Sequence, residues 1–190
     1  MSNCSRDPNR GDCLSPTSPQ LLANPLDFIH EDHLRERQVC TMLDRIAAVD
    51  QPDLNEIRQV LEFLRDGLPR PLEDEEQDLF PRLRRRCERE DEIGKVIERL
   101  RSDHRHAHED TPLVIADLEA IDRREGELSH QVRARLARFA GHARRHLTLE
   151  NAIVLPFAKL RLTRGDLESL RLRMMQRRGL DRVMEPDHAQ

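Results

Sequence analysis

Residues 139–157 decide the fold, and they read Phe-Ala-Gly-His-Ala-Arg-Arg-His-Leu-Thr-Leu-Glu-Asn-Ala-Ile-Val-Leu-Pro-Phe. In an α-helix, residues three or four positions apart lie on one face. That spacing joins two imidazoles and a carboxylate with apolar residues: Phe139, His142, His146, Glu150, Ile153 and Phe157. Burying polar groups without partners is costly, and a metal ion held between helices is one partner that satisfies them. The stretch therefore predicts a helix with metal-binding groups on its buried face.

The composition favours a helical protein with solvated charged faces. Charged residues make up 36% and hydrophobic residues 37% of the chain, a mixture that suits amphipathic helices. The net charge of −4 gives no overall attraction to nucleic acid, and no run is apolar enough to span a bilayer. Residues 1–20 lack the apolar core of a secretion signal, and the four cysteines form no Cys-x-x-Cys pair. We therefore expect a cytoplasmic protein without a nucleic-acid or membrane partner.

One domain with a tail at each end is expected for a chain of this length. Residues 1–23 are rich in Ser, Pro, Asn, Asp and Gly, which predicts a disordered tail. Apolar spacing and cap residues place helices at about 25–50, 53–87, 92–121 and 127–160, and the prolines in 67–71 kink or break the second. The pattern predicts an all-α, up-down-up-down four-helix bundle over 24–162. A turn at 163–166, a short C-terminal helix within 163–180 and a frayed tail at 181–190 complete the prediction.

Each predicted helix carries metal-ligand types on its inward face. The candidates are His33 on the first helix, Glu75 on the second, His104 and His108 on the third, and His146 and Glu150 on the fourth. Imidazoles and carboxylates without a thiolate indicate a two-metal non-haem site, for which iron is preferred and zinc or manganese also suits. His142, one turn before His146, is expected to orient a neighbour by a hydrogen bond. The remaining polar candidates are assigned to the surface (His106, His130, His188), and Cys40 to the core as a small hydrophobe.

The residues resemble the hemerythrin-like (HHE cation-binding) domains over roughly 24–162. The resemblance is carried by Pro25-Leu-Asp-Phe with His33, Glu75-Glu-Gln-Asp-Leu-Phe-Pro81, Asp103-His104, and His146-Leu-Thr-Leu-Glu150 with Leu155-Pro156. It implies a four-helix bundle around a di-iron centre. It also implies iron ligands at His33, Glu75, His104, His146 and Glu150, with the two glutamates as bridges.

The chain departs from the pattern of that family at one ligand. The family usually has a histidine four residues before the glutamate of the second helix, and here Pro71 stands at that position. Three interpretations follow: His108 supplies the missing nitrogen, His30 moves in from one turn before His33, or the second iron position stays open. We favour His108, which is one turn after His104.

The resemblance implies that the iron meets a small diatomic ligand, oxygen or nitric oxide, in a sensor, carrier or scavenger. A second hypothesis is a di-iron oxidase, a peroxidase-like enzyme or a nitric-oxide-reducing stress enzyme. No separate acid, base or nucleophile cluster and no flavin or nicotinamide motif marks a catalytic site, so no catalytic residue is assigned. A third hypothesis is a regulatory bundle stapled by metal, in which residues 167–178 dock a protein partner.

Overall fold

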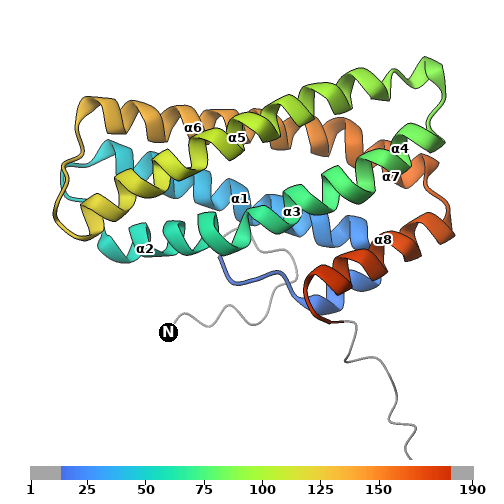
Figure 1. Ribbon diagram of the computed structural model, residues 1–190, viewed down its shortest axis with the longest axis horizontal. Coiled ribbons are helices and arrows are strands. Elements are labelled where there is room, and N and C mark those ends of the chain that lie inside the picture. The colour runs from blue at the N-terminus through green and yellow to red at the C-terminus, as the bar shows by residue number, and fades with distance from the viewer. Residues whose placement is uncertain (1–13, 181–190) are drawn as a thin grey trace, which may run out of the picture.

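A computed structural model describes residues 14–180, and all regular structure in this range is helical (Figure 1). Long helical segments lie side by side along the long axis: α1 (Pro25–Ala48), α2 to α4 (54–86), α5 (Ile93–Asp122), and α6 with α7 (130–161). The prediction of an all-helical bundle is thereby confirmed. The parts of the predicted tails at 1–13 and 181–190, with His188, lie outside the described residues.

The helices begin where side chains can satisfy the free amide groups of the first turn. Asn24 caps α1 by accepting a hydrogen bond from the Leu26 amide, and Pro25 occupies the first helical position, where an amide is dispensable. The Ser129 hydroxyl accepts from the Val132 amide, so α6 (His130–Leu149) begins after Ser129 rather than near Glu127.

The second long segment is interrupted by two π-helical turns. Its parts are α2 (Leu54–Glu62), η2 (Phe63–Gly67), α3 (Pro69–Asp74), η3 (Glu75–Leu79) and α4 (Phe80–Arg86). Regular helix is lost at Leu68, inside the range where the prolines predict a kink. A third π-helical turn, η5 (Glu150–Val154), joins α6 to α7 (Leu155–Arg161).

Each π-helical turn begins six residues before a proline: Pro69, Pro81 and Pro156. A proline lacks the amide that would bond the carbonyl four residues earlier, and its ring displaces that carbonyl. The turn widens instead, and the residue before each proline bonds the carbonyl five residues back, as the Phe80 amide bonds the Glu75 carbonyl. Two of these turns begin at Glu75 and Glu150, and π-helical turns are frequent at functional sites.

The buried apolar residues form two separate clusters along the bundle. One includes Leu26, Phe80, Leu100 and Val154, and the other includes Leu43, Leu64, Leu118 and Leu136. On every long segment a buried polar residue lies in sequence between members of the two clusters: His33, Glu75, His104, His146 and Glu150. The bundle therefore contains a buried polar layer between two apolar cores.

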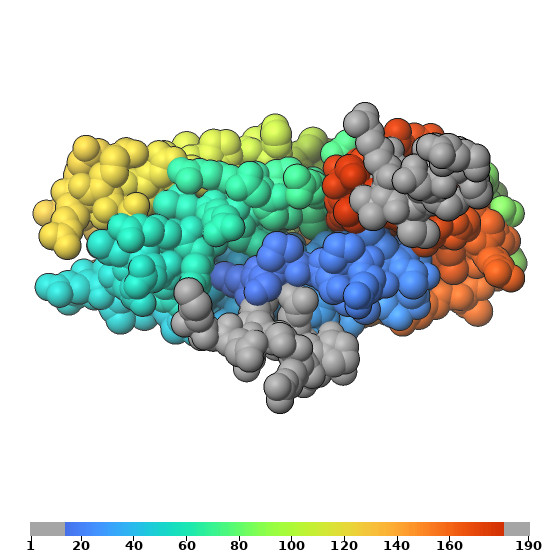
Figure 2. All heavy atoms as spheres, turned by 90° about the horizontal axis from the view of Figure 1, so that it is seen from below, coloured from blue at the N-terminus to red at the C-terminus, as the bar shows by residue number. Residues whose placement is uncertain are grey.

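The segment before α1 and the last helix pack together against one side of the bundle. Residues Pro19–Ala23 form a 3₁₀-helix, η1, that buries Leu22, so the described part of the predicted tail is ordered. The predicted turn at 163–166 is instead the start of α8 (Arg164–Arg177), because Thr163 and Asp166 form a capping box. Figure 2 shows α8 beside the start of α1. No helix within residues 14–180 has the length and apolar character needed to cross a membrane.

Candidate metal centre

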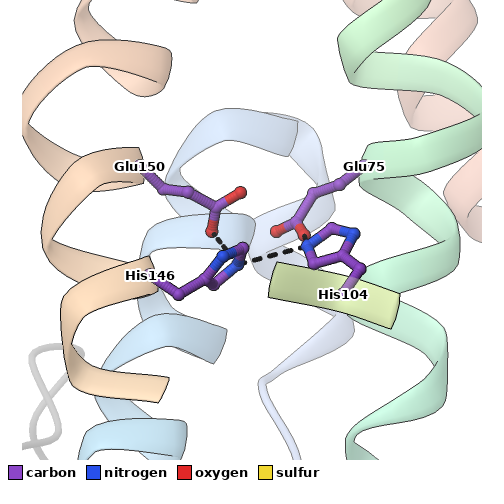
Figure 3. Close-up of side chains that lie close together, drawn as sticks. All are labelled: Glu75, His104, His146 and Glu150. Carbon is purple, nitrogen blue, oxygen red and sulfur yellow. Dashed lines mark hydrogen bonds and ion pairs between the residues drawn. The ribbon is translucent and has the colours of Figure 1, made fainter. Parts of the chain in front are cut away.

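Four buried side chains from three helical segments point toward one another in the polar layer (Figure 3). Ligand atoms of Glu75, His104, His146 and Glu150 all lie within 4.8 Å of one another. The Nε2 atoms of His104 and His146 are 3.2 Å apart, and His146 Nε2 is 3.2 Å from Glu150 Oε2. Nitrogen ligands of one ion, each about 2.1 Å from it, are about 3.0 to 3.4 Å apart at ordinary bond angles. The spacing of these atoms therefore fits a shared ion.

His33 approaches the same carboxylates from α1. Its Nε2 is 3.3 Å from Glu75 Oε1 and 3.2 Å from Glu150 Oε2. The other oxygen of Glu75, Oε2, is 3.4 Å from His104 Nε2. Glu75 thus faces one imidazole with each oxygen, which is the arrangement that a carboxylate between two ions requires.

The outer nitrogens of the histidines face oxygen atoms. His33 Nδ1 donates to Asn151 Oδ1 at 2.8 Å, and His104 Nδ1 donates to Glu76 Oε1 at 3.0 Å. His146 Nδ1 lies 3.9 Å from Asp103 Oδ2, beyond hydrogen-bond distance. An imidazole that donates through Nδ1 presents an unprotonated Nε2 to a metal. Asn151 and Glu76 therefore fix the tautomers that suit metal binding.

Charges within the cluster shift the protonation of its members. Burial disfavours the charged form of His146, but the carboxylates of Glu150, Glu75 and Glu36 together outweigh burial and raise its pKa to about 9. Burial alone would raise the pKa of Glu150, yet the His146 and His33 imidazoles hold that pKa well below its usual range. The pKa of His33 is likewise raised against burial, by Glu150 and Glu75. In the metal-free protein, protons on the imidazoles balance the carboxylates.

Several buried oxygens of the cluster lack a well-aligned hydrogen-bond donor among the described residues. Glu75 Oε2 and both carboxylate oxygens of Glu150 form no well-aligned hydrogen bond, although an imidazole nitrogen lies within 3.4 Å of Glu75 Oε2 and of Glu150 Oε2. Buried carboxylate oxygens normally have partners, and a cation between these oxygens and the imidazoles would be one. The donor set of imidazole and carboxylate fits iron, manganese or zinc. The residues present thus fit a metal centre.

His108 and His30 lie outside this cluster. His108 is exposed and lines a surface hollow together with His104, Glu76 and Leu72, but it is not among the residues whose ligand atoms converge. Along α5, the residues that face the bundle are separated by four and then by three positions. The next such residue after His104 is therefore Ala107. His30 is exposed, and its Nδ1 is 3.3 Å from the Asn151 oxygen that His33 contacts.

His142 is exposed and contacts His106 rather than a residue of the cluster. The two rings meet edge to face with centroids 6.4 Å apart. Both line a cavity of about 30 Å³ whose inner end is formed by His104 and His146. His142 and His106 therefore lie at the surface end of a path to the cluster.

Glu36 was missed by the sequence analysis, although it lines this cavity on α1. Burial raises the pKa of Glu36 to about 7, against the opposing effect of the His146 and His33 imidazoles. The signal was available, because the inward residues of α1 also alternate in steps of three and four, through Ile29, His33, Glu36 and Cys40. Cys40 is buried as predicted, and burial raises the pKa of its thiol to about 12.

The fold and the buried cluster define a helical-bundle protein with a candidate metal site. The family model described as "Hemerythrin HHE cation binding domain" matches residues 24–158. The chain therefore belongs to this family, which confirms the resemblance that the sequence motifs carry. No curated protein matches the chain.

Proposed function

We propose that this protein holds two iron ions and uses them to bind or sense oxygen or nitric oxide. The observation that carries the proposal is the buried cluster of His33, Glu75, His104, His146 and Glu150, with carboxylate oxygens that lack well-aligned donors. Glu75 and Glu150 lie between the imidazole of His33 and those of His104 and His146, as bridging ligands would. Membership of a cation-binding family supports the same conclusion.

The cavity beside the cluster supports a very small ligand. Its volume is about 30 Å³, and a single water needs about 10 to 15 Å³ measured in this way. Leu68, Leu72 and Phe139 contribute apolar walls, which suit a neutral diatomic molecule better than an ionic substrate. An organic substrate of ordinary size has no room in this cavity, which both His104 and His146 line.

Bound iron would supply reversible electron transfer to the diatomic ligand. The chain would supply three things: it holds the metal, excludes bulk water through the two apolar cores, and orients the imidazoles through Asn151 and Glu76. The proposal includes an up-down-up-down order of the four long segments. Its support is the short connections at 49–53, 87–92 and 123–129, because short connections join antiparallel neighbours.

The test is reconstitution with ferrous iron without oxygen, followed by metal analysis and absorption spectra before and after oxygen or nitric oxide is added. The proposal expects about two irons per chain and a new absorption band that saturates at a fixed ratio of ligand to protein. Continued consumption of oxygen, peroxide or nitric oxide would instead favour the enzyme hypothesis. A protein that takes up no iron would refute the proposal. A metal that only stabilises the fold would give no absorption band that depends on oxygen or nitric oxide.

A cavity-filling variant separates ligand access from metal binding. Ala143→Leu places a larger side chain in the wall of the cavity, whereas Ala137→Leu makes the same change on the exposed face of α6. Ala143→Leu should keep its iron and bind oxygen or nitric oxide more slowly. Equal association rates for the two variants would mean that the ligand reaches the iron by another path.

A further inference from the structure

The two ends of the cluster are unequally supplied with nitrogen ligands. His104 and His146 both face the carboxylates from one end, with their Nε2 atoms 3.2 Å apart. His33 faces the carboxylates from the other end, where Nε2 lies 3.2 Å from Glu150 and 3.3 Å from Glu75. An ion held next to His33 therefore needs a further donor.

Position 71 cannot supply that donor. Pro71 lies one helical turn before Glu75, and its ring has no lone pair available for a metal. His108 and His30 are both exposed, and the His30 imidazole lies beside Asn151. The further donor must come from a residue that faces the polar layer.

Glu36 faces that layer from the same helix as His33. It lies three residues after His33, so the two side chains share a face of α1. It lines the cavity together with His104, His146 and Leu72, the residue next to Pro71. The charged groups with the strongest electrostatic effect on it are His146, His33, Glu75 and Glu150.

The Glu36 carboxylate has no direct partner. It forms no hydrogen bond or ion pair with any residue between 14 and 180, whereas four other acids each pair with arginine or histidine: Asp74, Glu76, Asp78 and Glu150. Glu36 is half-buried, and a carboxylate partly removed from water without a partner costs free energy that a bound cation would offset.

We propose that Glu36 is a further ligand of the metal centre and supplies an oxygen donor, since position 71 offers no nitrogen. This inference rests on the proposed metal centre. The centre then offers three carboxylates, from Glu36, Glu75 and Glu150, beside the imidazoles of His33, His104 and His146. The third carboxylate balances more of the charge of two divalent ions, and oxygen donors suit iron and manganese.

The test is an anaerobic titration with ferrous iron by equilibrium dialysis, on the parent protein and on matched Glu→Gln variants. Glu36→Gln keeps the size of the side chain and removes its charge, and Glu73→Gln makes the same change at an exposed position of α3. In Glu36→Gln the first equivalent should bind as in the parent, and the second should bind at least about tenfold more weakly. Glu73→Gln should bind both equivalents like the parent.

A second variant tests the replacement directly. Pro71→His in the Glu36→Gln background should restore the second equivalent, because it returns a nitrogen donor one turn before Glu75. A second equivalent that binds Glu36→Gln as tightly as the parent would overturn the role of Glu36 and leave the metal centre intact. An equal loss of both equivalents would overturn it too. A parent protein that binds no iron would overturn the proposed function itself.

Discussion

Asp74 lies at the centre of a buried ionic network that fastens α8 to the bundle. Its side chain is 1% exposed, Arg177 Nε donates to it at 2.5 Å, and an Arg178 guanidinium nitrogen lies 2.7 Å from it. Burial raises the pKa of Asp74 in spite of both guanidinium groups. Asp74 also immediately precedes Glu75, so the network holds the helical turn that presents this candidate ligand.

Removing both arginines should leave Asp74 buried and unpaired. In Arg177→Met/Arg178→Met, Asp78 still pairs with Arg82 at 2.7 Å and Asp32 still pairs with Arg35 at 2.9 Å. Asp74 is the residue of this network that loses every arginine partner. Breaking a buried ion pair on one side costs about 3 to 5 kcal/mol. Arg178→Met alone leaves Arg177 in place and should cost about 1.5 to 3 kcal/mol, the value of one hydrogen bond to a charged group. At about 2 to 4 °C per kcal/mol, the double variant should melt about 6 to 20 °C lower.

The assay is urea unfolding of the chelator-treated protein at pH 7.5, followed by circular dichroism at 222 nm. Arg171→Met on the same helix is the control, because Arg171 pairs with the half-exposed Glu168 and should cost less than about 1 kcal/mol. Adding Asp74→Asn to the double variant should recover part of the loss, since no buried charge remains. A double variant no less stable than the control would refute the reasoning and leave the apolar contacts of α8 as its only attachment.

Three further outcomes are expected. Stability of the metal-free protein should fall as pH rises: protonated His146 stabilises the fold fully below its unfolded pKa of about 6.5, and this is lost as pH passes its folded pKa of about 9. Urea unfolding at pH 6, 7.5 and 9 checks this, and a flat profile would contradict it. His108→Ala should keep the iron content of the parent, measured by metal analysis, whereas His104→Ala should lose iron; equal losses would place His108 among the ligands. Thr163→Ala should cost about 0.5 to 2 kcal/mol in urea unfolding, because the Asp166 amide loses its cap, and an unchanged midpoint would show that the cap is dispensable.

The local rules of helix formation were sufficient to find most of the fold. The sequence alone identifies Asn24 as the cap and Pro25 as the first residue of α1. Both preferences depend only on the neighbouring backbone amides. Metal-ligand types at helical spacing on four segments were sufficient to find the polar layer. His33 and Glu75 contact each other although 42 positions separate them, since each lies on the inward face of its helix.

Other features required a count of the inward positions along the whole helix. A step of four from His104 leads to His108, but the helix continues inward through Ala107, because a stripe that faces a bundle averages about 3.5 residues per turn. The same count on α1 places Glu36 between His33 and Cys40. A count in steps of four alone favours His108 and passes over Glu36.

The sequence by itself determined that the chain is helical, where most helices begin, and which family it belongs to, because these follow from short-range spacing and from motifs. Only the tertiary structure decided which oxygen faces which imidazole, that the cavity ends at His104 and His146, and that α8 is held by Asp74. Such contacts depend on the rotation and axial shift of one helix against another. Those are set by packing over the whole bundle, so no single stretch of sequence contains them.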